Sequence, residues 1–319
     1  MHLHEDPSYT NISLIANMNS YLDLARQGKT GWRRFVLAVA LILFLWQILG
    51  ALPSVFLVIW VLADGNPQTG LSSSGQFVGL EPVISFAVPM LGSVFFLLGL
   101  YLAIRFIHQR PFRTLITPAR RIAWGRFFQG FAVWFVLSGL MSLAEAFLFP
   151  GRYIWTLDLR RYIPFAFLAL LLIPIQTSAE ELFFRGYILQ GVGLHLRNIW
   201  ILSAISGFLF MLPHFLNPEA RVNYGLMGFY YFFIGAVMAY VTLKDGRLEL
   251  ALGLHAANNL FTALFANYTV TVMPTPSLFT VTTLDAVYSV SAAVIGLLVF
   301  VLILVGPFRR RLPDENLVG

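Results

Sequence analysis

The sequence predicts an all-α, polytopic membrane protein with about eight transmembrane helices and both termini in the cytoplasm. Apolar and aromatic residues make up 58% of the 319 residues, and Asp, Glu, Lys and Arg only 11%, against roughly 25% in soluble domains. The apolar residues fall in runs that reach or approach the roughly 20 residues of a membrane-crossing helix. The basic residues fall in short clusters between those runs, as membrane topology requires.

The composition also excludes several classes of protein. A water-facing surface needs more charge than this chain carries, which excludes an ordinary cytosolic enzyme, and a disordered chain would be polar and charge-rich. The formal charge is +6, but its scatter between apolar runs argues against a nucleic-acid partner. Cysteine is absent, so there is no disulfide framework, thiolate metal site or cysteine nucleophile.

The N-terminal segment, residues 1–34, is expected to be cytoplasmic. Within it, residues 12–25 predict an amphipathic helix lying on the membrane, because five apolar side chains recur at helical spacing: Leu14, Ile15, Met18, Leu22 and Ala25. A second interfacial segment, 108–126, mixes basic with aromatic residues. Membrane lipids, in particular anionic headgroups, are the expected partners of both.

The transmembrane domain, residues 35–306, contains all the candidate spans. Each span must be a helix, because unpaired backbone groups are too costly in lipid, and the alternating pattern of a membrane barrel is not present. Residues 64–82, rich in Gly, Ser and Pro, predict an outer linker, and residues 307–319 a cytoplasmic basic tail. The expected spans are 35–63, 83–107, 127–149, 162–190, 199–216, 224–243, 250–269 and 286–306.

Basic residues indicate the orientation. With both ends inside, 17 of the 21 Lys and Arg residues lie in inner segments and only four, Arg152, Arg160, Arg161 and Arg221, in outer ones. Arg strongly outnumbers Lys, which indicates a GC-rich, bacterial genome. The expected location is the bacterial plasma membrane.

Ionisable residues inside spans are costly and usually mark function. Glu145 lies near the outer end of the third span, where it can pair with Arg152. The fourth span contains Glu180, Glu181 and Arg185. Glu181 and Arg185 are four residues apart and share a helix face, so they predict an ion pair. Glu180 points elsewhere without a local cation, and it can act as a general base if water reaches it; a salt bridge at a helix end is the alternative.

Two later spans carry the remaining polar residues. His214 ends the fifth span, after Pro213, and His255 and Asn259 lie four apart near the start of the seventh. At about 1.5 Å per residue, all of these groups and Glu180 reach overlapping depths. They therefore predict one polar chamber opening to the cytoplasmic side. Packed histidines and interhelical hydrogen bonds are the alternative interpretation.

These motifs resemble those of the CPBP family, the CAAX proteases and bacteriocin-processing enzymes. Glu180-Glu181 with Arg185 is similar to the family's EExxxR motif, Phe210 to His214 to its FxxxH, and His255 to Asn259 to its HxxxN. The resemblance covers about residues 160–270, the expected catalytic core. It implies an eight-helix intramembrane endopeptidase acting on membrane-associated peptides or proteins, which are lipid-modified in the prenyl-protein branch and linked to peptide bacteriocins in bacterial relatives.

Carried over residue by residue, the resemblance implies that Glu180 and His214 activate water and that His255 and Asn259 bind the oxyanion. Glu181 and Arg185 become the supporting pair. Asn258, beside Asn259, leaves open which amide faces the chamber. A zinc site formed by Glu180, His214 and His255 is the metal-dependent alternative, but the HExxH spacing of common zinc proteases is missing, and a metal-free Glu/His site is slightly favoured.

Two other function classes use the same residues. A transporter or proton relay would need the Glu/Arg/His cluster to carry protons, although the sequence shows no internal repeat. A non-catalytic bacteriocin-immunity or scaffold protein would keep the fold without chemistry. Cleavage that depends on Glu180 distinguishes an endopeptidase from both.

Overall fold

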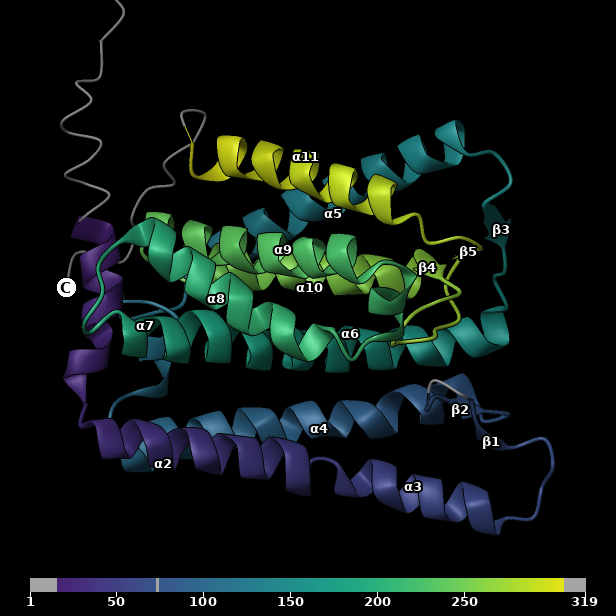
Figure 1. Ribbon diagram of the computed structural model, residues 1–319, viewed down its shortest axis with the longest axis horizontal. Helices are drawn as coiled ribbons and strands as arrows, with labels where there is room; N and C mark the ends of the chain where they lie inside the picture. Colours follow the sequence, from purple (N-terminus) through teal and green to yellow (C-terminus); the bar gives the residue numbers. More distant parts are fainter. Residues whose placement is uncertain (1–15, 73–74, 307–319) are drawn as a thin grey trace, which may run out of the picture.

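The computed structural model describes residues 16–72 and 75–306. Within these ranges the chain is a bundle of long helices joined by short connections (Figure 1). Six of the described helical stretches are long and apolar enough to cross a membrane. The prediction of an all-α polytopic membrane protein is therefore confirmed. The six stretches are Trp32–Ala63, Pro82–Ile107, Trp124–Leu148, Leu159–Val192, Tyr224–Asp245 and Ala286–Leu304.

Each predicted span has a helical counterpart in the described chain, although several helices contain π-helical or short irregular stretches. The elements of the first half are η1 (Leu24–Gln27), α2 (Trp32–Leu43), η2 (Phe44–Leu49), α3 (Leu52–Ala63), α4 (Pro82–Leu102), η3 (Ala103–Ile107), η4 (Phe112–Leu115) and α5 (Trp124–Leu148). Those of the second half are α6 (Leu159–Glu181), η5 (Leu182–Ile188), α7 (Leu189–Val192), α8 (Ile199–His214), η6 (Pro218–Val222), α9 (Tyr224–Asp245), α10 (Glu249–Leu264) and α11 (Ala286–Leu304).

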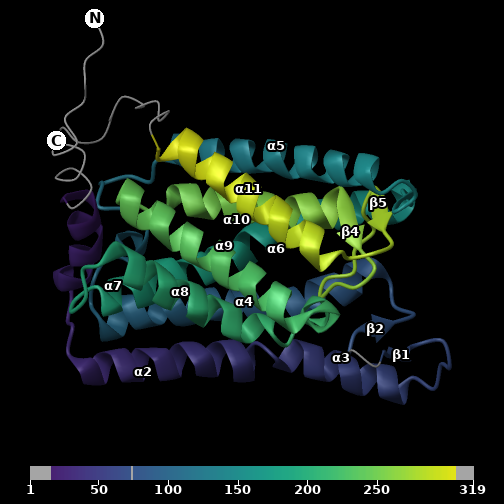
Figure 2. The same ribbon diagram turned by 45° about the horizontal axis from the view of Figure 1, so that its top comes forward.

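Two helices are shorter than a full membrane span. α8 and α10 have 16 residues each. Most side chains of α10 are buried, on every side of the helix, and α5, α6 and α9 pack around it (Figure 2). α10 therefore forms the centre of the bundle, and protein rather than lipid covers it.

The helices are arranged in layers (Figure 1). α2, α3 and α4 form a hairpin on one side of the molecule, α5 and α11 lie on the opposite side, and α6, α8, α9 and α10 lie between them. Glycines allow the closest helix contacts: a Cβ at Gly253 of α10 would lie 2.1 Å from the carbonyl oxygen of Phe127 in α5. Small residues serve the same purpose at many helix crossings in membranes.

Short strands gather at one end of the bundle, a feature that the sequence analysis did not predict. β1 (Gly70–Leu71) and β2 (Phe77–Val78) form a small hairpin in the predicted 64–82 linker. β3 (Tyr153–Trp155), β4 (Ala266–Tyr268) and β5 (Phe279–Val281) form a three-stranded sheet in the order β3-β5-β4. We call this the strand end. The opposite end carries the predicted cytoplasmic segments, and we call it the basic end.

The predicted amphipathic helix does not lie on a lipid surface where it is described. Residues 16–23 are helical, and Met18, Tyr21 and Leu22 are buried against side chains of α7, α8 and α9. Leu14, Ile15 and the basic tail 307–319 lie outside the described residues. The three described positions of the predicted apolar face, Met18, Leu22 and Ala25, are buried, and the spacing could not predict that protein would cover them.

The interfacial interpretation of residues 108–126 is wrong for three of its basic or near-basic side chains. His108, Arg110 and Arg126 are buried. His108 Nε2 lies 3.0 Å from the Tyr187 hydroxyl, Arg110 donates to Gln190, and Arg126 pairs with Asp245. Each finds a polar partner on a neighbouring segment, which local sequence spacing could not predict.

Candidate active site

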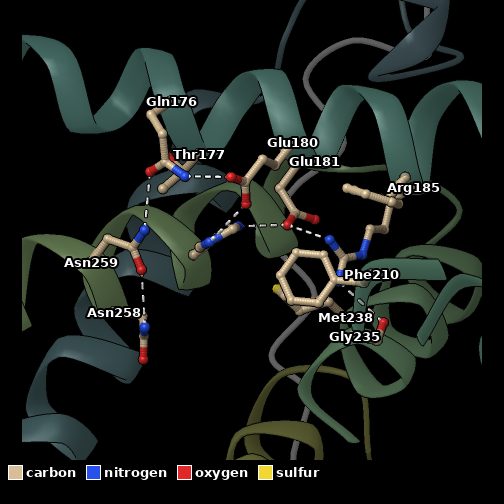
Figure 3. Close-up of polar contacts among 12 residues, drawn as sticks. Gln176, Thr177, Glu180, Glu181, Arg185, Phe210, Gly235, Met238, Asn258 and Asn259 are labelled. Atoms are coloured by element: carbon tan, nitrogen blue, oxygen red, sulfur yellow. Dashed lines mark hydrogen bonds and ion pairs between the residues drawn. The ribbon is translucent and has the colours of Figure 1, made fainter. Parts of the chain in front are cut away.

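Helix α6 and its π-helical continuation η5 carry the first group of site residues (Figure 3). Gln176 and Glu180 are four residues apart, as are Glu181 and Arg185, so each pair shares a helix face. The two glutamates are adjacent and point in directions about 100° apart. Short π-helical stretches inside longer helices occur often at functional sites.

Glu181 is the buried anchor of the site. Its Oε1 accepts a hydrogen bond from Arg185 Nη1 at 2.8 Å and lies 2.7 Å from His255 Nδ1. The guanidinium of Arg185 also donates to the carbonyl oxygen of Gly235 and lies 4.2 Å from the centre of the Phe210 ring. The predicted Glu181–Arg185 pair is therefore present, and it also ties α6 to α9 and α10.

Glu180 has different surroundings from Glu181. Its side chain is 17% exposed, against 0% for Glu181. Its Oε1 accepts a hydrogen bond from Gln176 at 2.6 Å, whereas its Oε2 accepts none from any described residue. This Oε2 lies 3.7 Å from His255 Nε2. Oε2 of Glu181 also accepts no hydrogen bond from a described residue, but only Glu180 lines the cavity.

His255 lies between the two glutamates. Because a carboxylate only accepts hydrogen bonds, its Nδ1 carries the hydrogen that bonds Glu181. In the neutral ring, Nε2 is then an acceptor that faces another acceptor, Glu180 Oε2. His255 can therefore donate through Nε2 only when its ring carries a second proton.

The amide side chains of α10 connect to Glu180 through a residue that the sequence analysis missed. Asn259 Nδ2 donates to Gln176 Oε1 at 3.0 Å, and Gln176 in turn donates to Glu180. Asn258 donates through Nδ2 to Asn259 Oδ1, and its Oδ1 accepts from Trp134 Nε1. Both amides line the same cavity. Gln176 lies one turn before Glu180 in an apolar span, and this position could have identified it as a site residue.

His214 ends α8 on another wall of the site. Its Nδ1 donates to the carbonyl oxygen of Phe210 at 2.6 Å, because a carbonyl can only accept. The ring packs against Tyr231, with centroids 4.5 Å apart. Pro213 lies inside α8, and the helix continues through it to His214. In the neutral ring Nε2 is therefore the acceptor nitrogen, available to a water molecule or substrate.

One cavity of about 580 Å³ brings these residues together. It is lined by Gln176, Glu180, His214, His255, Asn258 and Asn259, among others. The expectation of one polar chamber is met, but its direction differs from the prediction. No described residue of the basic end lines the cavity, and its lining residues at the strand end are Leu216, Asn217, Glu219, Ala266, Asn267, Tyr268, Val270, Thr271, Val272, Met273, Leu284, Tyr288 and Ser289. The depth estimate from helix rise could not predict which end the packed side chains would close.

The metal-dependent alternative does not fit this arrangement. Among the described residues, no three His, Cys, Asp or Glu side chains are arranged to hold a metal ion. His255 directs Nδ1 to Glu181 and Nε2 to Glu180, and His214 uses Nδ1 on its own helix. The proposed zinc set of Glu180, His214 and His255 therefore receives no support, and no step below uses a metal.

Glu145 has the partner that the sequence predicted. Its Oε1 lies 3.5 Å from Arg152 Nη1, and its Oε2 accepts from the hydroxyls of Tyr153 and Tyr268. Arg152 also pairs with Asp285. Glu145 is therefore a structural acid that joins α5 to the strand end.

The protein is an all-helical membrane bundle. Its site has a buried Glu–Arg–His cluster and a second carboxylate, Glu180, that lines a cavity. Such an arrangement is typical of intramembrane sites in which a carboxylate transfers a proton. Comparisons with known proteins identify the family. The model of the type II CAAX prenyl endopeptidase Rce1-like family matches residues 160–261. The uncharacterized protein YyaK of Bacillus subtilis (strain 168) is 36% identical over 268 residues, which cover 83% of this chain and 88% of that protein. No solved structure matches.

The chain therefore belongs to the Rce1-like family of type II CAAX prenyl endopeptidases. This confirms the family resemblance carried by the three motifs, all of whose residues lie within the matched segment. At the level of the family, the protein is an integral membrane endopeptidase.

Proposed function

We propose that the protein is an endopeptidase that hydrolyses peptide bonds of membrane-associated peptides or proteins with a water molecule activated by Glu180. The observation that carries the proposal is the cavity, which contains a carboxylate with a free acceptor atom beside two imidazoles and two amides. The Bacillus relative supports a location in the bacterial plasma membrane.

The proposed reaction needs no covalent intermediate. Glu180 takes a proton from water through Oε2, and the acceptor nitrogen of His214 helps to orient that water. The hydroxide attacks the scissile carbonyl carbon, Asn259 donates its second Nδ2 hydrogen to the resulting oxyanion, and His255 donates from Nε2 in the protonated form of its ring. Glu180 then returns the proton to the nitrogen of the leaving amine as the C–N bond breaks, so one water is consumed for each bond cleaved.

The supporting residues have a positional role in this scheme. Glu181 is fully buried, does not line the cavity and bonds Arg185 and His255 through Oε1, so it holds the imidazole in place rather than accepting a proton from water. Gln176 links Asn259 to Glu180 and fixes both amide and carboxylate. The catalytic groups are thus positioned by contacts from α6, α9 and α10.

The test compares membrane peptides from cells that produce the wild-type chain, Glu180→Gln and Asn259→Ala. We expect Glu180→Gln to abolish cleavage while the folded protein is still recovered, because the amide cannot take a proton. Loss of one oxyanion donor in Asn259→Ala should lower kcat by about 10²–10³-fold. Cleavage products that persist unchanged in Glu180→Gln would refute the proposal.

A further inference from the structure

We infer that substrates enter the cavity from the strand end and from the adjacent lipid, not from the basic end. The substrate class is then a membrane-anchored peptide, neutral or basic in the cleaved segment, presented on the extracytoplasmic side. This inference rests on the proposed endopeptidase activity and on the predicted orientation. Failure of the entry route, of the endopeptidase activity and of the orientation each gives a different experimental result.

The cavity meets the surface at the strand end. Three of its lining residues there are exposed: Leu216 (83%), Val270 (38%) and Val272 (45%). They come from the connection after α8 and from the segment that follows β4. We call them the rim. Their exposed apolar side chains suit contact with a peptide more than contact with water.

A second opening faces the hydrocarbon. Gln47 in η2 is exposed and lines the cavity, together with Trp46 of the same segment and with Met90 and Ser93 of α4. An exposed amide within a membrane helix is costly in lipid, and its place at the cavity wall gives it access to a polar partner. The apolar anchor of a substrate can lie in the bilayer here while its polar segment extends toward the rim.

The basic end is closed by buried contacts. The Tyr21 hydroxyl donates to the carbonyl oxygens of Leu115 and Arg185. Gln190 accepts from Arg110 and donates to the carbonyl oxygen of Thr114. These side chains are fully or almost fully buried, and no described residue from 16–34 or 103–126 lines the cavity.

The charges on the cavity wall select among peptides. Its described lining includes the carboxylates of Glu145, Glu180 and Glu219 and no Lys or Arg. Glu145 pairs with Arg152, and Glu180 has only the imidazole of His255, 3.7 Å away, as a basic neighbour. Glu219 Oε2 is buried and accepts no hydrogen bond, so it can accept from a neutral or basic segment but offers no cation to an acidic one.

The experiment uses the absence of cysteine in the chain. Single-cysteine variants are made at the rim (Leu216→Cys, Val272→Cys), at the cavity wall (Ala292→Cys) and at the exposed basic end (Arg120→Cys). Intact cells are treated with a bulky, membrane-impermeant maleimide, and cleavage is measured for each variant before and after labelling. We expect complete labelling at Leu216→Cys to lower cleavage at least tenfold, and Arg120→Cys to react only after permeabilisation and to keep its cleavage rate.

A readout without catalysis distinguishes the two proposals. A small impermeant thiol reagent should modify Ala292→Cys from outside the cell, and a bulky adduct at Leu216→Cys in the double variant should block that modification. Modification only from the cytoplasm, or full cleavage with a completely labelled rim, would overturn the entry route. If this pattern of modification is observed but no cleavage depends on Glu180, the proposed endopeptidase activity is refuted. The proposed entry route at the strand end is then still supported.

Membrane-tethered reporter peptides test the substrate class. A reporter with a neutral or Lys-containing segment on the extracytoplasmic side should be cleaved, and its cytoplasmic or Asp-containing counterparts should not. Preferential cleavage of the cytoplasmic or acidic reporters would overturn the assignment.

Discussion

Glu180 and Glu181 are neighbours of the same type, and their surroundings differ because each helical residue turns by about 100°. Glu181 points at Arg185 and His255, and Glu180 points into the cavity. The sequence predicted this division, since the i,i+4 spacing alone assigns Arg185 to Glu181. It could not predict that His255 lies between both acids. That contact depends on how α6 and α10 pack, and Glu181 and His255 are 74 residues apart in the sequence.

Gln176 gives a prediction at the residue scale. Replacing Gln176 by Leu removes the hydrogen bonds to Glu180 and Asn259 without touching the proposed reacting atoms. We expect kcat to fall roughly 10–100-fold with KM little changed, because the groups lose their positions rather than their chemistry. Steady-state kinetics on a cleaved reporter peptide measure the two constants.

Thr177→Val is the matched control for Gln176→Leu. Thr177 is the next residue of α6, and its hydroxyl donates to the carbonyl oxygen of Ile173 in its own helix. The Thr177→Val variant should keep kcat within a few-fold of the wild-type value. Equal losses in the two variants would show that Gln176 contributes only to the stability of α6.

Glu219 gives a pH-dependent prediction, since it lies in η6, outside the spans. Burial raises the pKa of its carboxyl, and it outweighs the Val272 N–H group and the Thr271 side chain, which favour the charged form. A raised folded-state pKa adds stability below the unfolded pKa, and this stability is lost as pH rises through the folded pKa. We therefore expect Glu219→Gln to melt near the wild-type temperature at low pH and above it at neutral pH.

Thermal unfolding in detergent between pH 4 and pH 8 measures that difference. Asp158→Asn, an exposed carboxylate at the same end, controls for a general change in net charge. A Glu219→Gln curve parallel to the wild-type curve at every pH would show that burial of this carboxylate does not contribute to stability.

At the scale of elements, helix positions were predictable and helix partners were not. Runs of apolar residues located all eight helical segments, because lipid requires a closed backbone. The same runs could not show that α10 is central and short, or that residues 16–23 pack on α7, α8 and α9. The three-stranded sheet was missed because its strands have three residues each and come from distant connections.

The α5–α10 crossing gives the prediction at this scale. Gly253→Ala would place a Cβ 2.1 Å from the Phe127 carbonyl oxygen, so the helices must separate. We expect a loss of about 1–3 kcal/mol in stability and a larger loss of cleavage, because α10 carries His255 and Asn259. Unfolding in detergent and cleavage assays measure both effects.

Gly139→Ala is the control for that crossing. Gly139 also lies on α5, but its added Cβ would make only an ordinary contact, 3.8 Å from Phe261 Cε2. It should be neutral or slightly stabilising, since alanine favours helix over glycine. If both variants lose the same stability, close packing is not what glycine provides at position 253.

At the scale of the whole molecule, the two ends of the bundle differ. The basic end is closed by buried hydrogen bonds and an ion pair, such as Arg126 with Asp245, and the strand end opens into the cavity. The sequence separated the two ends by their charge alone. It could not identify the open one, since closure depends on side chains such as Tyr21 that meet residues about 94 and 164 positions away.

The orientation of this bundle gives the last prediction. Because 16 of 21 basic residues lie in the segments of the basic end or the tail, and Arg185 lies in the site, the positive-inside rule places both termini in the cytoplasm. Cysteines at His2→Cys and Val318→Cys should resist an impermeant maleimide in intact cells and react after permeabilisation. Arg160→Cys, exposed near the strand end, should react in intact cells. The reverse pattern would place the strand end in the cytoplasm, and cytoplasmic peptides would then be the substrates that reach Glu180.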